Sequence, residues 1–600
     1  RQFTWVSAGL SSPEASFTLA RSTAARDWEA EYARIEMTNA SQVDIQTGNP
    51  KWDLAFALGQ KTALNLIHGP TEFLPHPSWV QTRLPDQGFS LRSDGSEYGH
   101  LWDGQTPLDT WHLCGLLLPA YPNIAQDLIR NFLSTQNNEG HVDWKPGLNG
   151  RRTGILATPI LSTLAWKIYQ ANEDLPFLDE VFPALLKFYN HWFDPRYDGD
   201  GDGVPEWSHP VQTGFEDNPL FAYWQPWSQG ADISLFESPS LIAMLLRDGQ
   251  SLLKMSRVLE RLGAVHDLNQ RIEKLTIALS RTWNEKSGSY RYLDRETHAS
   301  TDGNTIGRRT GPGMVQLSQT QFDDPVRLLV RVYPTGEGAR DVQVHISGKN
   351  GDGNQETEMF TPENFRWSLG IGTGISKNVF TVLDDIRVEN ISPDDKVVIH
   401  SVDFGFHDQT LLTPLWVGTP TPEQAEKIIK KHIMRPNRYW RGYGIPACLN
   451  PESRAAETVE IFQTVWTPWN ALIGEGLVQF EYHDLAAELV SRLMDAIGSN
   501  LQETGSFRKH FNSVTGKGIG EKNALSGLPP LHLFLNILGV NLHSPWKVGL
   551  KGKNPFPWPV KIRFRGLVID RDLEVTLVTF PDGQTVKVNN PTPCIVTGRP

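Results

Sequence analysis

Two long blocks of the chain repeat their apolar residues three and four positions apart, and this helical period constrains the fold more than any other feature. The first block carries the repeat in segments 51–69, 123–136, 160–173, 235–263 and 267–285. The second block carries it in TPEQAEKIIKKHI, VWTPWNALIGEGLVQF, HDLAAELVSRLMDAIG and LPPLHLFLNILG. Polar loops rich in Gly and Pro separate these segments. The pattern predicts a large body of amphipathic helices.

Between the two blocks the apolar pattern changes to the alternation of β-strands. The runs VRLLVRVYP, ARDVQVHISG, NVFTVLDDIRVENIS and KVVIHSVDFG alternate or are rich in β-branched residues, and turn clusters such as GKNGDGN divide them. A further β segment, VKIRFRGLVIDRDLEVTLVTFPDGQTVKV, closes the chain, with PDGQ as a hairpin turn. The fold class is therefore mainly α, with an inserted β-sandwich and a C-terminal β segment.

A chain of 600 residues exceeds the size at which one hydrophobic core stops growing, so several domains are expected. Loops that concentrate aromatic and acidic residues between long helices favour a toroid of helical hairpins with a site at one mouth. A solenoid gives a similar pattern, but the chain has no repeat of solenoid length and the β insertion argues against one. The predicted division is an N-terminal extension (1–50), a helical catalytic domain (51–321 and 405–545), the inserted β-sandwich (322–404) and the C-terminal β segment (546–600).

The charge balance excludes several classes of partner. The formal net charge is -12 and the sequence pI is about 5.8, whereas nucleic-acid binding needs a basic surface. The same charge disfavours an anionic membrane surface, and no apolar run has the length of a transmembrane helix. The three cysteines show no CxxC spacing, so neither a metal knuckle nor a disulfide framework is expected. Oligomeric state stays open, as does the choice between a cytoplasmic and a secreted location.

The aromatic composition points to a sugar ligand. The chain has 20 Trp, and several stand in polar segments: HLWDGQ, HVDWKPG, PEWSHP and RYWRGYG. The apolar face of such a ring can stack on the C–H face of a sugar while neighbouring acids and amides bind the hydroxyls. Alternatively, the rings lie at the edges of a large core.

Seven motifs occur in an order that resembles glycoside hydrolase family 63, which includes the bacterial mannosylglycerate and glucosylglycerate hydrolases and is related to the trehalase-like clan. They are HLWDGQ, ATPILSTLAW, GDGVPEWSHPVQTGFEDNP, TWNEKSGSYRYLD, YWRGYGIP, VWTPWNALIGEGL and GSFRKHFNSVTGKGIG. The resemblance covers roughly residues 50–320 and 405–540 and does not include the β insertion. It implies a six-hairpin (α/α)6 barrel that hydrolyses a glycosidic bond with inversion.

The same resemblance assigns the general acid to Asp217, which precedes an Asn-Pro turn in TGFEDNP. Inverting hydrolysis needs a protonated carboxyl beside the leaving oxygen and a second carboxylate that activates water. An apolar setting or a like charge raises the pKa of such an acid. The nearby aromatic rings are suited to supply the apolar setting, and Glu216 is suited to supply the like charge. The alternative is that Glu216 and Asp217 cap a helix or lie in a solvated loop.

The catalytic base departs from the family pattern. The family's base glutamate lies in a phrase like F-x-E-Y-Y, whereas this chain reads FRKHF and has Lys509 at that position. A lysine ammonium is electrostatically wrong beside a developing oxocarbenium ion and accepts no proton. Glu521 in GIGEKN is the first replacement candidate, and Glu503 in QETGSF the second. A base from another loop, at Glu457 or Glu460, and a catalytically impaired site are the remaining alternatives.

Several residues match the family's sugar-binding positions. Trp102 and Asp103 resemble its W-D pair, in which the carboxylate bridges two sugar hydroxyls. Asp103 is alternatively the N-cap of the following helix. The other candidates, each of which is alternatively a core residue, are Trp144, Lys145, Trp440, Arg441, Trp466, Trp469 and Asn470.

The segment DGDGDGVPE resembles an oxygen-rich calcium loop. Asp198, Asp200, Asp202 and Glu206 follow positions 1, 3, 5 and 9, and Val204 follows position 7, which ligates through its backbone carbonyl. Position 12 falls on a histidine, so the loop is no ordinary EF-hand. The alternative is an acidic, solvated turn. Calcium is the one cofactor that the sequence indicates.

The leading prediction is an inverting, exo-acting glycoside hydrolase for a small oligosaccharide or glycoside. The resemblance alone implies an α-glucoside or α-mannoside. A second hypothesis is a glycan-binding or scaffold protein that has lost its base. A third is a glycosidase or lyase for acidic sugars, for which Arg508 and Lys509 would bind a carboxylate.

Overall fold

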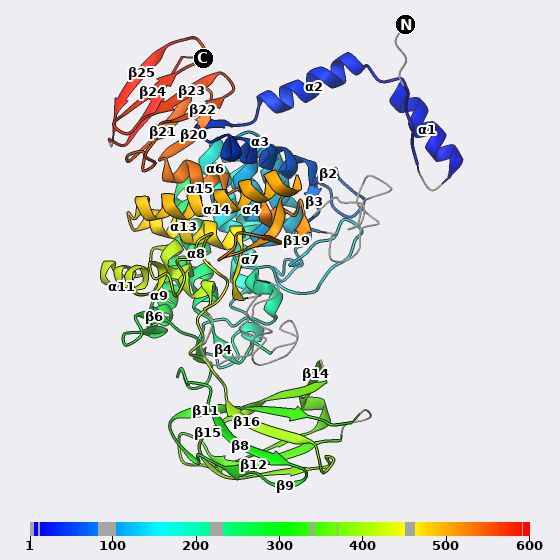
Figure 1. Ribbon diagram of the computed structural model, residues 1–600, viewed down its shortest axis with the longest axis vertical. Coiled ribbons are helices and arrows are strands. Elements are labelled where there is room, and N and C mark those ends of the chain that lie inside the picture. Colours follow the sequence, from blue (N-terminus) through cyan, green and yellow to red (C-terminus); the bar gives the residue numbers. More distant parts are fainter. Residues whose placement is uncertain are drawn as a thin grey trace.

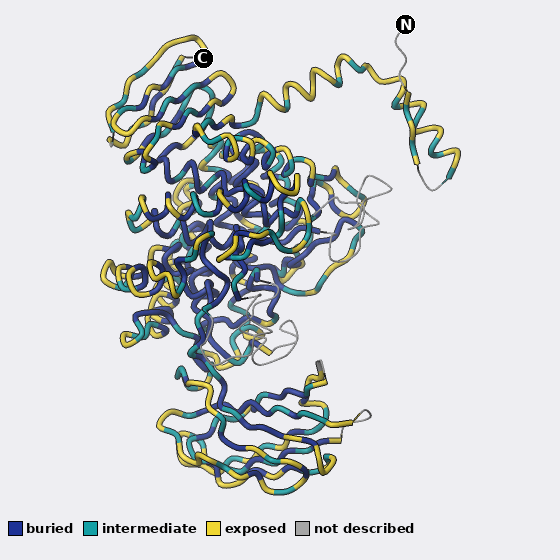
Figure 2. The backbone as a smooth tube through the Cα atoms, viewed as in Figure 1, coloured by how far each residue is buried: buried dark blue, intermediate teal, exposed yellow. Residues whose placement is uncertain are grey.

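The computed structural model describes residues 5–9, 12–81, 104–215, 232–336, 341–368, 370–449, 462–590 and 592–599. A helical body occupies the middle of the molecule, with one β module at each end (Figure 1). Buried residues concentrate in the helical body and inside both β modules (Figure 2). Helices α1 (Pro13–Ala24) and α2 (Trp28–Ala40) extend away from the body and contain no buried residue.

The helical body is built on a closed ring of helices in mutual contact. Around the ring each helix contacts the next, and the last contacts the first. In order these are α4 (Pro107–Leu117), α6 (Leu161–Asn172), α8 (Pro239–Val258), α10 (Thr413–Val417), α13 (Thr467–Gln479) and α15 (Leu531–Ile537). Helices that alternate with them along the chain pack outside the ring: α3 (Pro50–Asn65), α5 (Pro122–Leu133), α7 (Leu175–His191), α9 (Val265–Arg281) and α14 (His483–Thr504).

Burial separates the ring helices from those outside it. Nearly every residue of α4 and α13 is buried, whereas α9 buries only Leu268, Leu275, Ala278 and Leu279. A helix that is apolar on all sides must lie inside the protein, and a helix with one apolar stripe covers it. The apolar residues of the outer helices α5 and α9 therefore repeat with a clear helical period along the sequence.

The ring helices begin at a common mouth. Prolines stand in the first turn of α4, α8, α10 and α13, where their missing N–H and fixed φ favour helix initiation. The segments that precede the ring helices are the ones that carry the tryptophan and acidic motifs of the sequence. The fold therefore gathers those motifs at the end of the body where the ring helices start.

The inserted β domain is one antiparallel sheet, with nine strands among the described residues. Its main strands run in the order β8 (Thr305–Thr310), β16 (Lys396–Ser401), β11 (Gln321–Tyr333), β15 (Ile371–Glu389), β12 (Gln343–Lys349) and β13 (Gln355–Phe360). The apolar faces enclose a core of their own, which includes Val330, Phe380 and Ile399. The sheet begins at Thr305 rather than at the predicted boundary, residue 322, because β8 is too polar to show a β pattern. The predicted two-sheet sandwich is thus one sheet that surrounds a single core.

A buried ion pair joins the inserted domain to the helical body. Arg327 on β11 is 1% exposed, and its guanidinium donates to Asp294 Oδ2 at 2.6 Å and Oδ1 at 3.1 Å. Asp294 belongs to β7 (Leu293–Asp294), which pairs with β4 (Phe236–Glu237) in the body. Arg327 also donates to the carbonyls of Ser376 and Lys377. Bidentate geometry of this kind fixes β11 to the helical body.

We expect Arg327→Met to loosen the inserted domain, because it leaves the Asp294 carboxylate buried without its cation. Losing one partner of a buried pair costs about 3–5 kcal/mol. Hydrogen exchange of the β11 and β15 amides measures this loss as a lower free energy of local opening. Arg331→Met on the same strand, where the described residues supply no ion pair, is the control. Equal protection in the two variants would contradict the assignment.

The C-terminal β module includes a strand from near the N-terminus. Strand β1 (Asp44–Gln46) pairs with β22 (Val560–Phe564), at the edge of a sheet that continues through β23 (Leu567–Arg571), β24 (Val575–Thr579) and β25 (Thr585–Asn589). A second sheet joins β20 (Val540–Ser544), β21 (Lys547–Leu550) and β26 (Cys594–Thr597). The module therefore starts at Val540, earlier than the predicted 546, and part of the predicted N-terminal extension belongs to it.

Two further observations concern the cysteines and the search for a membrane-spanning helix. Cys114, Cys448 and Cys594 form no disulfide. No helix within the described ranges is both long and apolar enough to span a bilayer.

Candidate active site

A small cavity of about 20 Å³ opens at the mouth where the ring helices begin. Residues from widely separated segments line it: Gln81, Thr106, Leu108, Asp109, Trp144, Gly214, Trp466, Lys509 and Ser526. They come from the segments that precede α4, α6, α8, α13 and α15, or from the first turn of α4. Three of the predicted motifs, around Trp144, Trp466 and Lys509, therefore meet at one place.

Trp466 forms an aromatic wall of the cavity. Its ring lies 3.9 Å from the ring of His510, centroid to centroid, and 4.8 Å from that of Phe215 in an edge-on contact. Its indole Nε1 donates to Thr464 Oγ1 at 3.1 Å, which fixes the ring plane. Burial, together with the Lys509 charge, lowers the pKa of His510 well below its usual range, so this histidine is neutral.

Trp144 and Lys145 are held by a compact turn. The Asp143 carboxylate accepts hydrogen bonds from the Lys145 N–H, the Gly154 N–H and the Thr153 hydroxyl. Trp144 is 6% exposed and lines the cavity, and its buried indole N–H has no acceptor among the described residues. A buried donor without a partner is costly, so Trp144 is suited to donate to a ligand.

Lys509 and Glu521 lie side by side on a hairpin. Strand β18 (Arg508–Asn512) pairs with β19 (Gly518–Lys522), and Lys509 Nζ is 3.7 Å from Glu521 Oε2. Lys509 lines the cavity, and both side chains are partly buried. The structure thus brings the first base candidate next to the lysine that replaces the family's glutamate.

Asp109 is a carboxylate at the mouth that the sequence reasoning missed. It stands in the first turn of α4, lines the cavity, and accepts a hydrogen bond from the Thr106 hydroxyl at 2.8 Å. The spacing T-x-x-D marks a helix start, which is a common structural pattern. For that reason the motif carries no functional signal by itself.

Other predicted residues have structural roles away from the cavity. Glu503 is exposed in the last turn of α14. Trp440 donates to Glu488 on α14 and lies under the Arg492 guanidinium, and Arg441 donates to the Asn437 carbonyl.

Trp469 and Asn470, two predicted residues on α13, pack behind the wall of the cavity. Trp469 is 1% exposed and donates to the carbonyl of Gly214, a residue of the cavity wall. Asn470 is fully buried, with its amide bonded to the Ile445 backbone and the Trp466 carbonyl. Both residues position the wall, and neither lines the cavity.

Four predicted residues lie outside the described residues. They are the general acid Asp217 with its neighbour Glu216, and the W-D pair Trp102 and Asp103. Glu457 and Glu460, the alternative bases, lie outside them too.

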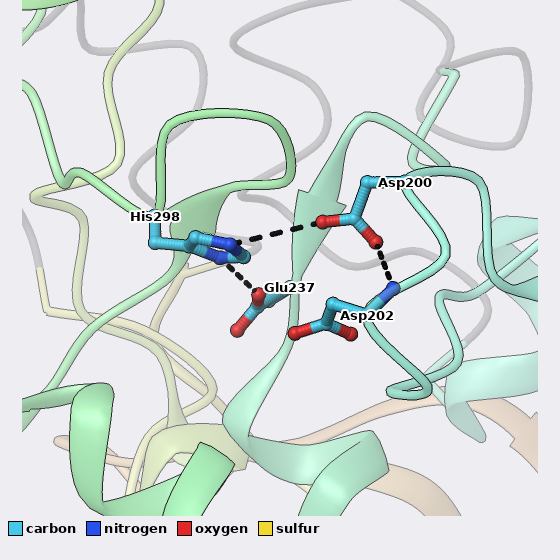
Figure 3. Close-up of side chains that lie close together, drawn as sticks. All are labelled: Asp200, Asp202, Glu237 and His298. Atoms are coloured by element: carbon cyan, nitrogen blue, oxygen red, sulfur yellow. Dashed lines mark hydrogen bonds and ion pairs between the residues drawn. The ribbon is translucent and has the colours of Figure 1, made fainter.

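The acidic loop Asp198–Glu206 forms two groups of possible metal ligands, and within each group the ligand atoms lie within 4.8 Å of one another. The first is all carboxylate: Asp198, Asp200 and Glu206. The second combines Asp200 and Asp202 with Glu237 and His298, which the sequence reasoning did not include (Figure 3). His298 Nδ1 lies 2.6 Å from Glu237 Oε1 and Nε2 lies 3.8 Å from Asp200 Oδ2.

The first group has the features of a cation site. Burial raises the pKa of Glu206 to about 8, and burial raises the pKa of Asp200 as well. Asp198 Oδ1 and Glu206 Oε1 are buried and have no hydrogen-bond partner among the described residues. A divalent cation with oxygen ligands would satisfy both atoms, and calcium prefers such ligands.

Val204, the other predicted ligand, and the cation Arg281 also make contacts in this loop. The Val204 N–H donates to Asp202 Oδ1 at 2.8 Å, as in a tight turn. The Arg281 guanidinium pairs with Asp202 at 2.7 Å, so part of the acidic charge is already balanced by protein.

Comparisons with known proteins agree with this fold. Residues 104–325 match the family described as the mannosylglycerate hydrolase MGH1-like glycoside hydrolase domain. A probable trehalase of Oryza sativa subsp. japonica is 32% identical over 96 residues, which is 16% of this chain and 15% of the length of the trehalase. The matched segment is thus a small part of that relative.

Two solved structures share the fold at low sequence identity. The GH63 mannosylglycerate hydrolase from Thermus thermophilus, in complex with Tris, has a TM-score of 0.50 and 13% identity, over 80% of this chain and 100% of that one. A sialidase has a TM-score of 0.53 and 9% identity, over 92% of this chain and 40% of that one. The expected resemblance to glycoside hydrolase family 63 is confirmed: residues 104–325 carry an MGH1-like glycoside hydrolase domain.

Proposed function

We propose that this protein is an inverting, exo-acting hydrolase of small α-mannosides or α-glucosides, and that its active site is the mouth of an (α/α)6 barrel. The observation that carries the proposal is the convergence of Trp144, Trp466 and Lys509, from separate segments, on one cavity at the start of the ring helices. The closed ring supports the barrel, and the family match supports the reaction class.

Chain connectivity supports Asp217 as the general acid. Gly214 lines the cavity and the Phe215 ring packs against Trp466. Asp217 follows Phe215 by two positions in the sequence, which supports a role at this wall. Aromatic neighbours raise the pKa of a carboxyl by desolvation, which keeps the acid protonated until it donates to the leaving oxygen.

We assign the catalytic base to Glu521. An inverting enzyme needs a carboxylate that removes a proton from the attacking water. Glu521 Oε2 lies 3.7 Å from Nζ of Lys509, and Lys509 lines the cavity, so this carboxylate lies beside the cavity. Asp109 is the other carboxylate at the cavity, and it becomes the base if Glu521 proves dispensable.

Trp144 and Trp466 provide the sugar platform in this proposal. The same connectivity argument supports a contribution from Trp102 and Asp103. They precede Gly104, whose φ is +100° and where an added Cβ would lie 2.6 Å from the Pro146 carbonyl oxygen. Gly104 thus packs closely against the backbone at Pro146, just after Trp144.

A substrate with a carboxylate is a second candidate, favoured by the cations at the mouth. Lys509 lines the cavity and Lys145 lies 6.0 Å from the Trp144 ring. The mannosylglycerate hydrolase among the related structures is named for a substrate with a carboxylate-bearing aglycone.

A substrate panel separates these candidates from a non-catalytic role. We expect release of reducing sugar from neutral α-mannosides or α-glucosides, or from their glycerate conjugates. A preference for the conjugates at least ten-fold in kcat/KM favours the acidic substrate. Sugar binding without hydrolysis of any compound would mean that the protein only binds glycans.

We propose calcium as a structural ion held by Asp198, Asp200 and Glu206. An ion that binds only the folded protein stabilises it by about 2.7 kcal/mol at a hundred times its Kd. We therefore expect millimolar CaCl₂ to raise the melting temperature above the value in EDTA. Glu206→Gln should abolish the difference. It should not lower the value in EDTA, because Glu206 is a buried carboxyl without full pairing.

Identical melting temperatures of the wild type in calcium and in EDTA would contradict the calcium site. Asp352→Asn, an exposed acid in the β domain, is the control and should keep the full calcium effect.

A further inference from the structure

A second and much larger cavity, of about 720 Å³, lies at the opposite end of the helical ring. It is lined by residues of α4, α6, α8, α13 and α15, most of which lie in the middle or the C-terminal parts of these helices. The C-terminal β module covers it with β20, β21 and the segment 593–595. None of its lining residues lines the cavity at the mouth. Its volume lies within the usual range for small-molecule sites.

The described lining of this cavity is cationic, although the chain as a whole carries a net charge of -12. Glu475 is the one acidic residue among the described lining residues. The cations are Lys167, Arg247, Lys254 and Lys551. An excess of positive charge inside a concave site attracts and holds anions.

Lys167 is the most buried of these cations. It is 7% exposed, and its Nζ lies 3.9 Å from the centre of the Trp111 ring. Its one nearby carboxylate among the described residues is Glu475, at 3.8 Å. Glu475 also accepts a hydrogen bond from the Trp416 indole at 2.8 Å and lies 3.6 Å from His532 Nε2. One shared carboxylate thus neutralises Lys167 only in part.

Arg247 has no carboxylate partner within the described part of the chain. No Asp or Glu of those residues lies within 4.0 Å of its guanidinium, which is half-buried above the Trp416 ring. Burial lowers the pKa of Arg247 by more than the charge of Glu475 raises it. A planar guanidinium in this state is suited to bind a carboxylate or a phosphate through two hydrogen bonds.

We propose that this cavity binds a small organic anion, whose carboxylate or phosphate group lies between Lys167 and Arg247. The cavity is too large for an inorganic ion alone, and Trp166, Leu118 and Leu535 offer an apolar wall for an organic body. This site is separate from the glycosidase mouth and does not depend on the function proposed for it.

The affinity for the anion has a predicted pH dependence. Burial lowers the pKa of Lys167 to about 8, so its charge is lost as the pH rises through that value, and binding weakens from pH 7 to pH 9. The groups that face Lys167 titrate elsewhere. Arg247 keeps its charge, His112 and His532 are neutral because burial lowers each pKa, and Cys114 is protonated because burial raises its pKa to about 12.

Calorimetry on the full chain tests the site with D-glucose 6-phosphate, D-glucuronate, inorganic phosphate and D-glucose. We expect at least one of the two organic anions to bind. Tighter binding of D-glucose 6-phosphate indicates a phosphate ligand, and tighter binding of D-glucuronate indicates a carboxylate ligand. Arg247→Gln and Lys167→Met should each weaken this binding at least ten-fold. Arg257→Gln, an exposed cation on the same helix, should not. Glu475→Gln should tighten it, because the competing carboxylate is removed.

Two further variants separate this cavity from the mouth. Asp217→Asn and Lys509→Gln should leave the binding unchanged, whatever they do to hydrolysis. The proposal is overturned if neither organic anion binds the wild type, if inorganic phosphate or neutral D-glucose binds as tightly as they do, or if Arg257→Gln loses as much affinity as Arg247→Gln.

Discussion

Asp217→Asn is expected to lower kcat on an alkyl α-glycoside by about 10²–10⁴-fold, the usual contribution of a positioned general acid. An amide cannot donate the proton that the leaving oxygen needs. On the matching α-glycosyl fluoride, whose leaving group needs little protonation, the loss should be at least ten-fold smaller. Comparing kcat on the two substrates therefore reports the acid role itself.

Glu216→Gln is the matched control for Asp217→Asn, because it changes the neighbouring carboxylate and leaves the proposed donor in place. It should retain activity within about ten-fold. Both variants should melt at the wild-type temperature. Equal losses on the alkyl glycoside and on the fluoride would contradict the role of Asp217 as acid.

Glu521→Gln is expected to remove hydrolysis of both substrates by a similar factor, about 10²–10⁴-fold. Water must be deprotonated whichever group leaves, so a good leaving group gives no rescue. Glu503→Gln, at the exposed end of α14, should leave kcat within about two-fold of wild type. This pair compares the two candidate bases under identical assay conditions.

Full activity of Glu521→Gln would exclude Glu521 as the base. Asp109→Asn would then be expected to show the loss instead, since Asp109 lines the same cavity. Loss in the Glu503 variant alone would contradict the location of the site, because that side chain lies on an outer helix.

Most helices of both layers were predicted from their apolar repeat, and the ones that were missed have physical reasons. Helix α9 buries one stripe and exposes the rest, so its residues repeat with a helical period. Helix α4 is buried on nearly all sides, and its segment PLDTWHLCGLL shows no such repeat. Helix α7 was missed as well, and its run of apolar residues is interrupted by Pro183. Burial on all sides thus removes the one-sided apolar repeat from α4.

The site was predictable only where its residues stand in recognisable sequence motifs. Trp144, Trp466 and Lys509 stand in motifs that are unusual for loops, and the structure brings them together. Trp469 and Asn470 share one of these motifs, but one turn of helix directs them into the packing behind the wall. Glu237 and His298 belong to no motif, and only tertiary structure brings them to the acidic loop. Spacing along the chain cannot reveal such long-range contacts.

Proton NMR of the first anomer released is the most direct test of single-displacement hydrolysis at this mouth. With an alkyl α-mannoside or α-glucoside that the wild type cleaves, the β anomer should appear first and then mutarotate. The signal should be absent with Asp217→Asn under the same conditions. Release of the α anomer first, or no hydrolysis of any α-glycoside, would contradict the account.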